Sequence, residues 1–174
     1  LRGEFLAVLA PYWPTVVSIA GSHGKTTVTA MLTHILLQAG HEPGYLIGGA
    51  VPSLSAPAAA GAGALLVTEV DESDGTQAAM RSSHAIVINV GDDHCWSVGG
   101  EAALHQCFKT FAGNAEELLC YATDATHALF DDHPNVTFVD VGAAKVLDLL
   151  VPGHHNQINA TLAVRQAVKL GVAE

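Results

Sequence analysis

Short apolar runs alternate along the chain with longer segments whose apolar residues recur every three or four positions. Runs of the first kind lie at 16–20, 65–68 and 85–90 and are rich in Val, Ile and Leu. Such runs are typical of strands that are buried on both faces of a parallel sheet. Shorter runs at 120–122 and 137–141 predict two further strands. The alternation predicts a three-layer α/β/α domain with a mostly parallel central sheet.

Segments with helical spacing follow several of these runs. The segment that starts at Thr26 has one apolar face, and Gly40 suits the left-handed residue that ends a helix. We expect two more helices at about 101–119 and 156–170. The stretch 52–63 is rich in Ala, Pro, Ser and Gly, which predicts a flexible connection, with a short Ala-based helix as the alternative.

Composition limits the classes of protein that fit. The 174 residues are 49% apolar and 14% charged, which suits one ordinary domain at 1–174 with a sizeable core. A net charge of −10 with seven Lys and Arg residues argues against a nucleic-acid partner. Glu4 and Pro11 interrupt the apolar N-terminal run, so we expect neither a membrane span nor a signal peptide there, and the start resembles a segment of a longer chain.

The cysteine pattern gives an expectation about compartment. Cys95, Cys107 and Cys120 are too few and too scattered for a disulfide framework, and they lack the paired spacing of a structural zinc site. We therefore expect reduced thiols in a cytoplasmic protein.

The segment between the first predicted strand and the first predicted helix reads Gly-Ser-His-Gly-Lys-Thr-Thr. In this position glycines let backbone N–H groups close on phosphate oxygens, and the helix start adds partial positive charge. Lys25 can reach the β- and γ-phosphates, and Thr26 can ligate Mg²⁺. The alternative is a glycine turn with a solvated lysine. The candidate nucleotide-binding residues of this phosphate loop are Gly21, Ser22, His23, Gly24, Lys25, Thr26 and Thr27.

An acidic segment follows the apolar run at 65–68. Glu69 comes directly after that run, where a carboxylate at a strand end can act as a hard oxygen ligand for Mg²⁺. Glu72 and Asp74 lie further along, and for them a solvated acidic loop is the alternative.

Four blocks of the chain, in order, resemble the Mur ligase family. The phosphate loop is similar to the family's Gly-Thr-His-Gly-Lys-Thr-Thr, and the block at 68–75 to a Glu-Ala-Asp-Glu-Ser-Asp segment. The block at 89–94 resembles Asn-Ile-x-x-Asp-His, and the block at 152–160 resembles Pro-Gly-Arg-His-Asn-x-x-Asn-Ala. Ala20 stands where the general phosphate-loop pattern has its first glycine, which counts against a general P-loop kinase or ATPase.

The resemblance implies roles for particular residues. Lys25, Glu69 and His94 would be the catalytic set, and Thr26, Glu69 and His94 the ligands of Mg²⁺. Judged by residue type alone, His94 is equally compatible with a capping or core histidine. The last block implies that a further set lies near the adenine and ribose of ATP, although helix capping would explain Asn156 about as well. That set is His155, Asn156 and Asn159.

The resemblance also implies a reaction and a domain organisation. The alanine-adding branch of the family joins L-alanine to UDP-N-acetylmuramate with ATP and Mg²⁺, through an acyl phosphate and with release of ADP. Its members carry an N-terminal UDP-binding domain and a C-terminal amino-acid-binding domain, and this chain corresponds to the central ATP-binding domain alone. We therefore expect the isolated chain to bind ATP and to have weak ligase activity or none.

Two other functions remain open. One is a ligase that attaches a peptide to the same sugar acid during cell-wall recycling. The other is a nucleotide-binding module without ligase activity, which the missing domains would suit. Three departures from the family pattern point the same way: Cys95 and Trp96 replace an apolar residue and an acid, and His154 replaces an arginine.

Overall fold

A seven-stranded sheet forms the centre of the molecule in the computed structural model, which describes residues 2–91, 95–143 and 146–173. The strand order is β3-β2-β4-β1-β5-β6-β7. Each described pair is parallel except β2 with β3. The strands are β1 (Thr15–Ala20), β2 (Gly44–Leu46), β3 (Ala58–Ala59), β4 (Leu65–Glu69), β5 (Ser82–Val87), β6 (Ala115–Tyr121) and β7 (Val136–Val139). The predicted mostly parallel sheet is confirmed.

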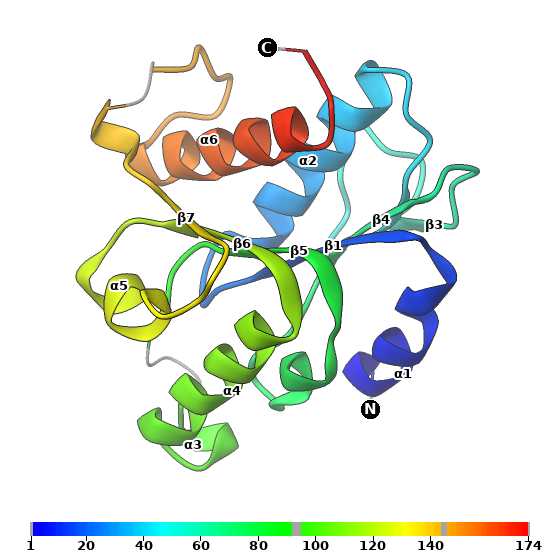
Figure 1. The fold of residues 1–174 in the computed structure, drawn as a ribbon. Helices are drawn as coiled ribbons and strands as arrows, with labels where there is room; N and C mark the ends of the chain where they lie inside the picture. Colours follow the sequence, from blue (N-terminus) through cyan, green and yellow to red (C-terminus); the bar gives the residue numbers. More distant parts are fainter. Residues whose placement is uncertain (1, 92–94, 144–145, 174) are drawn as a thin grey trace.

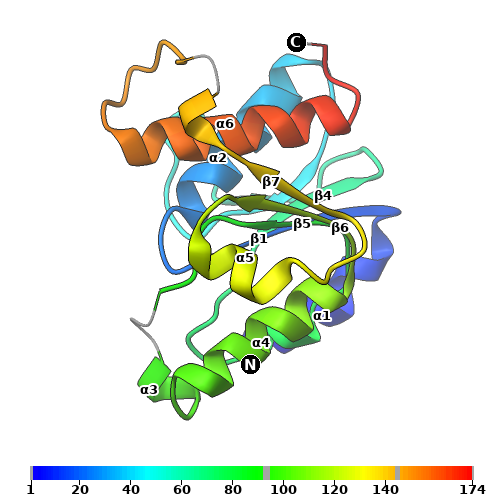
Figure 2. The ribbon, with the colours of Figure 1, turned by 60° about the vertical axis from the view of Figure 1, so that its left-hand side comes forward.

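Helices cover both faces of this sheet. Figures 1 and 2 show α2 (Lys25–Gln38) and α6 (His154–Lys169) on one face, and α1 (Arg2–Leu9), α4 (Glu101–Gly113) and α5 (Asp124–Phe130) on the other. The short elements are α3 (Cys95–Val98), η1 (Ala10–Tyr12), η2 (Thr76–Ala79) and η3 (Val141–Ala143). Within the described ranges, none of the helices has the length and apolar character needed to span a membrane.

Two apolar clusters hold the layers together, one on each face of the sheet. Alternate residues of β1 face opposite ways, so Val17 and Ile19 pack with α2 and α6, while Val16 packs with α1 and α4. Phe108 of α4 and Leu32 of α2 are completely buried at the centres of these clusters. Because each face of the sheet has its own apolar cover, the strands are nearly continuous apolar runs.

The central strand, β1, lies between β4 and β5. The chain passes from β1 through α2 to β2 on one side, and after β4 it crosses β1 to form β5 on the other side. In open parallel sheets, ligands bind at such a reversal of strand order, beyond the carboxyl ends of the strands. The loops that follow β1, β4 and β5 meet at this edge.

One predicted helix differs from the observed element. We expected a helix over about 101–119, but α4 ends at Gly113 and residues Ala115–Tyr121 form β6. The run Leu118–Cys120 is almost completely buried between β5 and β7, where pairing on both sides favours a strand. Amphipathic spacing alone could not locate the break between helix and strand.

Other local differences are smaller. The strand predicted at 85–90 starts earlier, at Ser82, and ends at Val87. The stretch 52–63 is mostly turns and bends, but it contributes β3 to the sheet edge, and the Ala-based helix is not formed. The three cysteines, all in the described part of the chain, are free thiols, and burial raises the pKa of Cys120.

Candidate nucleotide-binding site

The phosphate loop connects β1 to α2 with two glycines in the left-handed region. Gly21 has φ 144° and Gly24 has φ 89°, so both positions favour glycine over any residue with a Cβ atom. Gly24 also packs closely on α6, since a Cβ atom there would lie 2.6 Å from Asn159 Oδ1. Gly24 caps the 14-residue α2 without any side-chain hydrogen bond to its first N–H groups. Those N–H groups and the helix dipole make the loop suitable for a phosphate.

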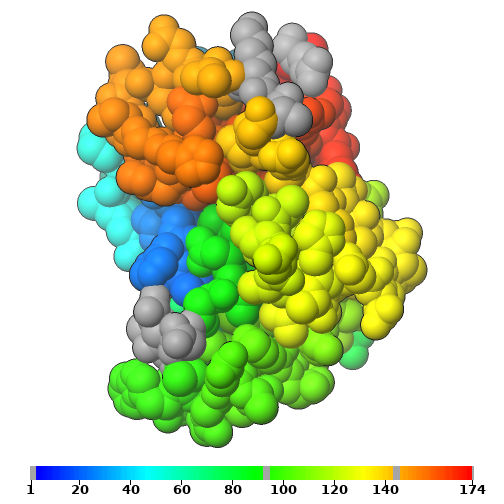
Figure 3. Space-filling model, turned by 90° about the vertical axis from the view of Figure 1, so that its left-hand side faces the viewer, coloured from blue at the N-terminus to red at the C-terminus, as the bar shows by residue number. Residues whose placement is uncertain are grey.

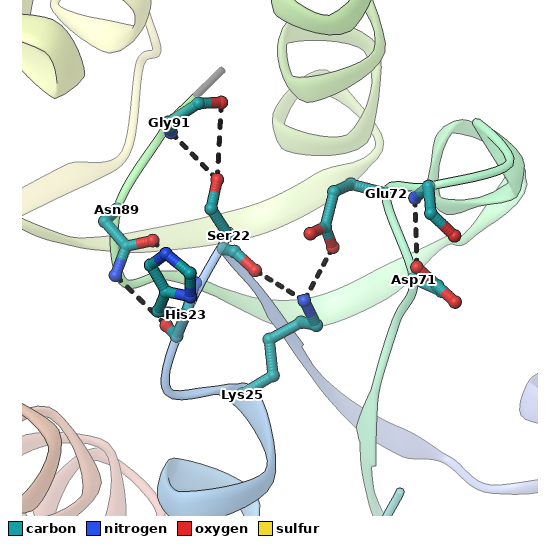
Figure 4. A network of polar contacts seen from close by, with 9 residues as sticks. Ser22, His23, Lys25, Asp71, Glu72, Asn89 and Gly91 are labelled. Atoms are coloured by element: carbon teal, nitrogen blue, oxygen red, sulfur yellow. Dashed lines mark hydrogen bonds and ion pairs between the residues drawn. The ribbon is translucent and has the colours of Figure 1, made fainter. Parts of the chain in front are cut away.

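The segment after β5 holds the loop in shape. Asn89 Oδ1 accepts a hydrogen bond from His23 N at 2.9 Å, and Asn89 Nδ2 donates to His23 O at 3.0 Å (Figure 4). Ser22 Oγ accepts from Gly91 N at 2.8 Å and is nearly buried. The hydroxyl of Ser22 therefore supports the loop, and the expected contact of this residue with the nucleotide stays a prediction. The sequence placed Asn89 in a family block but did not indicate this role.

Lys25 is held by two oxygen atoms. Its Nζ donates to Gly21 O at 2.7 Å and forms an ion pair with Glu72 Oε2 at 2.7 Å (Figure 4). The Glu72 side chain is only 1% exposed, so the alternative of a solvated acidic position is wrong for this residue. Asp74 is exposed, and its Oδ1 accepts from Thr76 N at 2.9 Å. The sequence placed these two acids together, but only the fold shows that one of them is buried.

Glu69 ends β4 beside the loop and has the properties of a cation ligand. Its Oε2 is buried without a hydrogen-bond partner in the described structure. Gly48 leaves room for the carboxylate, since a Cβ atom at Gly48 would lie 1.8 Å from Glu69 Oε1. A buried carboxylate oxygen without a donor is stabilised by a hard cation, so Glu69 fits the expected Mg²⁺.

The structure gives less support for the other two expected metal ligands, Thr26 and His94. Thr26 is exposed in the first turn of α2, and His94 lies outside the described residues. In the ranges that the structure describes, no group of three or more His, Cys, Asp or Glu residues is arranged to hold a metal. The Mg²⁺ site therefore stays a prediction.

A cavity of about 580 Å³ lies between the phosphate loop and α6, and we call it the α6-side cavity. The structure brings the predicted adenine and ribose residues of α6 to the loop there. Asn156 is not the N-cap of α6, because Gly153 occupies that position, so the capping alternative is wrong. Asn156 Nδ2 donates instead to Pro152 O at 2.8 Å. The cavity is lined by His23, Gly24, Thr27, Ile88, Asn89, Tyr121, Thr123, His155, Asn156, Ile158 and Asn159.

A second cavity, of about 190 Å³, lies between the phosphate loop and α1, and we call it the α1-side cavity. Lys25 and Glu69 are in its wall, whereas His23, Gly24 and Thr27 are in the wall of the α6-side cavity. Figure 3 shows the blue atoms of the phosphate loop at the surface, below the orange start of α6 and beside the green end of β5. The loop thus has a cavity on each side. The α1-side cavity is lined by Gly3, Leu6, Lys25, Glu69, Val70, Asp71, Asp74, Thr76, Gln77 and Met80.

Comparison with known proteins identifies the family. The profile of the Mur ligase middle domain matches residues 19–111. The chain belongs to the Mur ligase family. This assignment agrees with the resemblance of the four blocks, and it disfavours a general P-loop kinase or ATPase.

Curated members of the Mur ligase family align with nearly the whole chain. A UDP-N-acetylmuramate–L-alanine ligase of Renibacterium salmoninarum is 37% identical over 98% of this chain and 43% of its own length. The corresponding ligase of an Arthrobacter species is 37% identical over 99% of this chain and 43% of its own length. The chain therefore spans less than half the length of these relatives.

Solved Mur ligase structures have the same fold. The UDP-N-acetylmuramate:L-alanyl-γ-D-glutamyl-meso-diaminopimelate ligase of Neisseria meningitides superposes with a TM-score of 0.84 at 22% identity, over 98% of this chain and 66% of that one. The UDP-N-acetylmuramate–alanine ligase of Thermotoga maritima has a TM-score of 0.82 at 24% identity, over 98% of this chain and 45% of that one. At these identities the likeness supports the fold.

Proposed function

We propose that this chain is the ATP-binding middle domain of a ligase that joins L-alanine to UDP-N-acetylmuramate and releases ADP. The observation that carries the proposal is the phosphate loop, where Lys25 begins α2, the first N–H groups of α2 have no side-chain cap, and the Oε2 atom of Glu69 in the same cavity wall has no hydrogen-bond partner in the described structure. The names of the relatives at 37% identity support the choice of substrates.

The proposed nucleotide site uses both sides of the loop. The phosphates would bind the backbone N–H groups at the start of α2, with Lys25 at the terminal phosphate. Thr26, Glu69 and His94 would hold Mg²⁺. His155, Asn156 and Asn159 would bind the adenine and ribose, because they line the α6-side cavity at the opposite side of the loop from Lys25.

The proposed reaction requires charge neutralisation and alignment. A phosphoryl group passes from ATP to an oxygen of the muramoyl carboxylate, the amine of L-alanine attacks the acyl carbon, and phosphate leaves as the amide forms. Mg²⁺ would supply positive charge between the phosphate and the carboxylate. Lys25 would stabilise charge that develops on the transferred group, and the hydrogen bonds of Asn89 to His23 would keep the loop in shape.

The proposal places the remaining functions in other domains. Because the chain spans 43% of the length of its relatives, we infer that binding of the UDP group and of L-alanine requires flanking domains. The isolated chain would then bind nucleotide and ligate poorly.

A calorimetric titration of the chain with a non-hydrolysable ATP analogue and Mg²⁺ tests the proposal. We expect Lys25→Ala to weaken binding by ~10- to 100-fold, because each charge-assisted hydrogen bond is worth about 1.5–3 kcal/mol. Lys109→Ala is the matched control, since Lys109 is exposed on α4 away from both cavities. If the folded chain does not bind the nucleotide, or if both variants bind equally well, the proposal is wrong.

A further inference from the structure

The wall of the α1-side cavity contains a polar side chain that none of the roles above uses. Gln77 lies in η2, and its side chain is only 1% exposed. Neither its Nε2 nor its Oε1 has a hydrogen-bond partner in the described structure. A buried donor and acceptor that both lack partners cost free energy, so such a pair is retained where a ligand or a function requires it.

The shape of the cavity admits a small group with an apolar part. Its volume of about 190 Å³ exceeds the ~30 Å³ that one water occupies in the liquid, so several non-hydrogen atoms fit. Leu6 and Met80 give it apolar walls. Gly3 brings α1 close to η2, because a Cβ atom there would lie 1.9 Å from Thr76 Oγ1. Gln77 is thus accompanied by surfaces that suit a methyl group.

The charges of the wall favour a neutral ligand group. Among the lining residues that the structure describes, Lys25 is the one cation, whereas Glu69, Asp71 and Asp74 are acids. A carboxylate or a second phosphate deep in the cavity would be repelled. An ammonium group could donate to Oε1 of Gln77 but would leave Nε2 without an acceptor. A neutral group that offers a carbonyl beside an N–H or a hydroxyl complements both atoms.

We propose that Gln77 binds the N-acetylated part of the acceptor sugar, and that the acetamido group occupies the α1-side cavity. This inference rests on the proposed function, in which the acceptor is an N-acetylmuramate. Nε2 donates to the acetamido carbonyl, Oε1 accepts from an N–H or hydroxyl of the same sugar, and the acetamido methyl packs against Leu6 and Met80. Since Lys25 is in the same wall, this places the sugar acid beside the terminal phosphate. Gln77 is therefore a specificity-determining residue that selects N-acetylated acceptors.

An NMR titration of the ¹⁵N-labelled chain, saturated with ADP and Mg²⁺, tests this inference. The two probes are N-acetylmuramic acid and muramic acid, which lacks the acetyl group. We expect N-acetylmuramic acid to shift the side-chain amide resonances of Gln77 in a saturable way and to bind ~5-fold more tightly than muramic acid, the factor that a hydrogen bond of ordinary strength provides. Gln77→Met, which is close in size but has no strong donor or acceptor, should remove this preference and keep the affinity for ADP.

A second measurement separates a binding role from a structural one. Gln77→Met should move the urea midpoint of unfolding upward, because the variant no longer buries two polar atoms without partners. The matched control is Gln166→Met in α6. Gln166 is also 1% exposed with an unpartnered Nε2, but it does not line the cavity. That variant should keep the preference for the N-acetylated sugar.

The outcomes are distinct. Equal binding of the two sugars, no shift at Gln77, or a preference that survives in Gln77→Met would each overturn the inference. A drop in the urea midpoint of Gln77→Met would do the same, because it would show that the amide stabilises the fold. If ADP binds normally in these experiments, only the inference fails. If ADP does not bind to the folded chain, the proposed function fails as well.

Discussion

Two glycines determine how closely neighbouring segments approach the phosphate loop and Glu69. Gly24 allows α6 to contact the phosphate loop, and Gly48 allows the chain after β2 to contact Glu69. In both contacts the glycine contributes only backbone atoms, because it has no side chain. The geometry of the site therefore depends on positions where a Cβ atom is absent.

Gly48→Ala tests this dependence. The new Cβ would lie 1.8 Å from Glu69 Oε1 and 2.8 Å from Glu69 Cδ, so the carboxylate must move. We expect the variant to lose ~10-fold in the enhancement of ADP binding by Mg²⁺, the effect of one displaced charged ligand, and to bind ADP without metal as before. Calorimetric titrations of ADP in Mg²⁺ and in EDTA measure both quantities.

The neighbouring glycine supplies the control for this experiment. A Cβ atom at Gly49 would meet only Thr26 Cγ2 at 3.5 Å, which is an ordinary van der Waals contact. Gly49→Ala should therefore leave the metal dependence unchanged. An equal loss of ADP affinity with and without Mg²⁺ in Gly48→Ala would show that Glu69 has no part in metal binding.

The sequence predicted residue types at the site better than their environments. It placed Lys25 and Glu69 at strand ends that meet, because phosphate loops and acids after parallel strands follow local patterns. It did not predict that Glu72 is buried against Lys25, or that Ser22 supports Gly91. Burial and pairing of this kind depend on segments about 50 to 70 residues apart, and no local pattern encodes them.

Among the elements, α5 shows how a short helix is fixed by its ends. Thr123 and Thr126 form a capping box, in which Thr126 N donates to Thr123 Oγ1 and Thr123 N donates to Thr126 Oγ1. A helix of seven residues has little stability by itself, so its cap contributes a large share. Its shortness is also why the sequence did not reveal it, whereas the longer α2 and α6 were predicted to within a few residues.

Thr123→Ala should destabilise the protein by about 1 kcal/mol, the usual contribution of an N-cap hydroxyl. Urea unfolding followed by circular dichroism measures this change. Thr110→Ala is the control, because Thr110 is an exposed residue within α4 whose hydroxyl donates to Gln106 O at 2.9 Å. Alanine has the higher helix propensity there, so that variant should be neutral or slightly stabilising. A loss below about 0.3 kcal/mol for Thr123→Ala would contradict the assigned role of the cap.

At the scale of the whole molecule, a polar cluster joins the sheet to the end of α6 and makes stability depend on pH. Lys169 Nζ lies 2.8 Å from Glu117 Oε2, and His84 Nδ1 lies 3.6 Å from the same oxygen. Burial lowers the pKa of His84 below 6.5, and Glu117 and Glu116 oppose this shift only in part. The hydrogen bond from Lys169 lowers the pKa of Glu117 below 4.5.

Both shifts make the folded state less stable in acid. The unfolded chain takes up a proton at His84 near pH 6.5, whereas the folded chain does so only at lower pH, so stability is lost as the pH falls through this range. Glu117 adds a further loss below pH 4.5. We expect the urea midpoint to decrease from pH 7.5 to pH 5, and His84→Gln to reduce this decrease.

A surface histidine provides the comparison for the pH experiment. His34→Gln removes an imidazole from the exposed side of α2 and should leave the pH dependence as in the unchanged protein. If His84→Gln has the same slope as the unchanged protein between pH 7.5 and pH 5, the burial of His84 is not the source of the acid sensitivity.

The ion pair between Lys25 and Glu72 couples the binding of a phosphate at the loop to the binding of a cation at the acidic segment. It ties the phosphate loop to the acidic loop after β4, two segments that are 47 residues apart. A phosphate that draws the ammonium group away weakens the neutralisation of a buried carboxylate, which opposes phosphate binding. A cation bound at the acidic loop neutralises this carboxylate in place of Lys25, so the phosphate then binds at a lower free-energy cost. By thermodynamic reciprocity, each of the two ligands then raises the affinity for the other by the same factor.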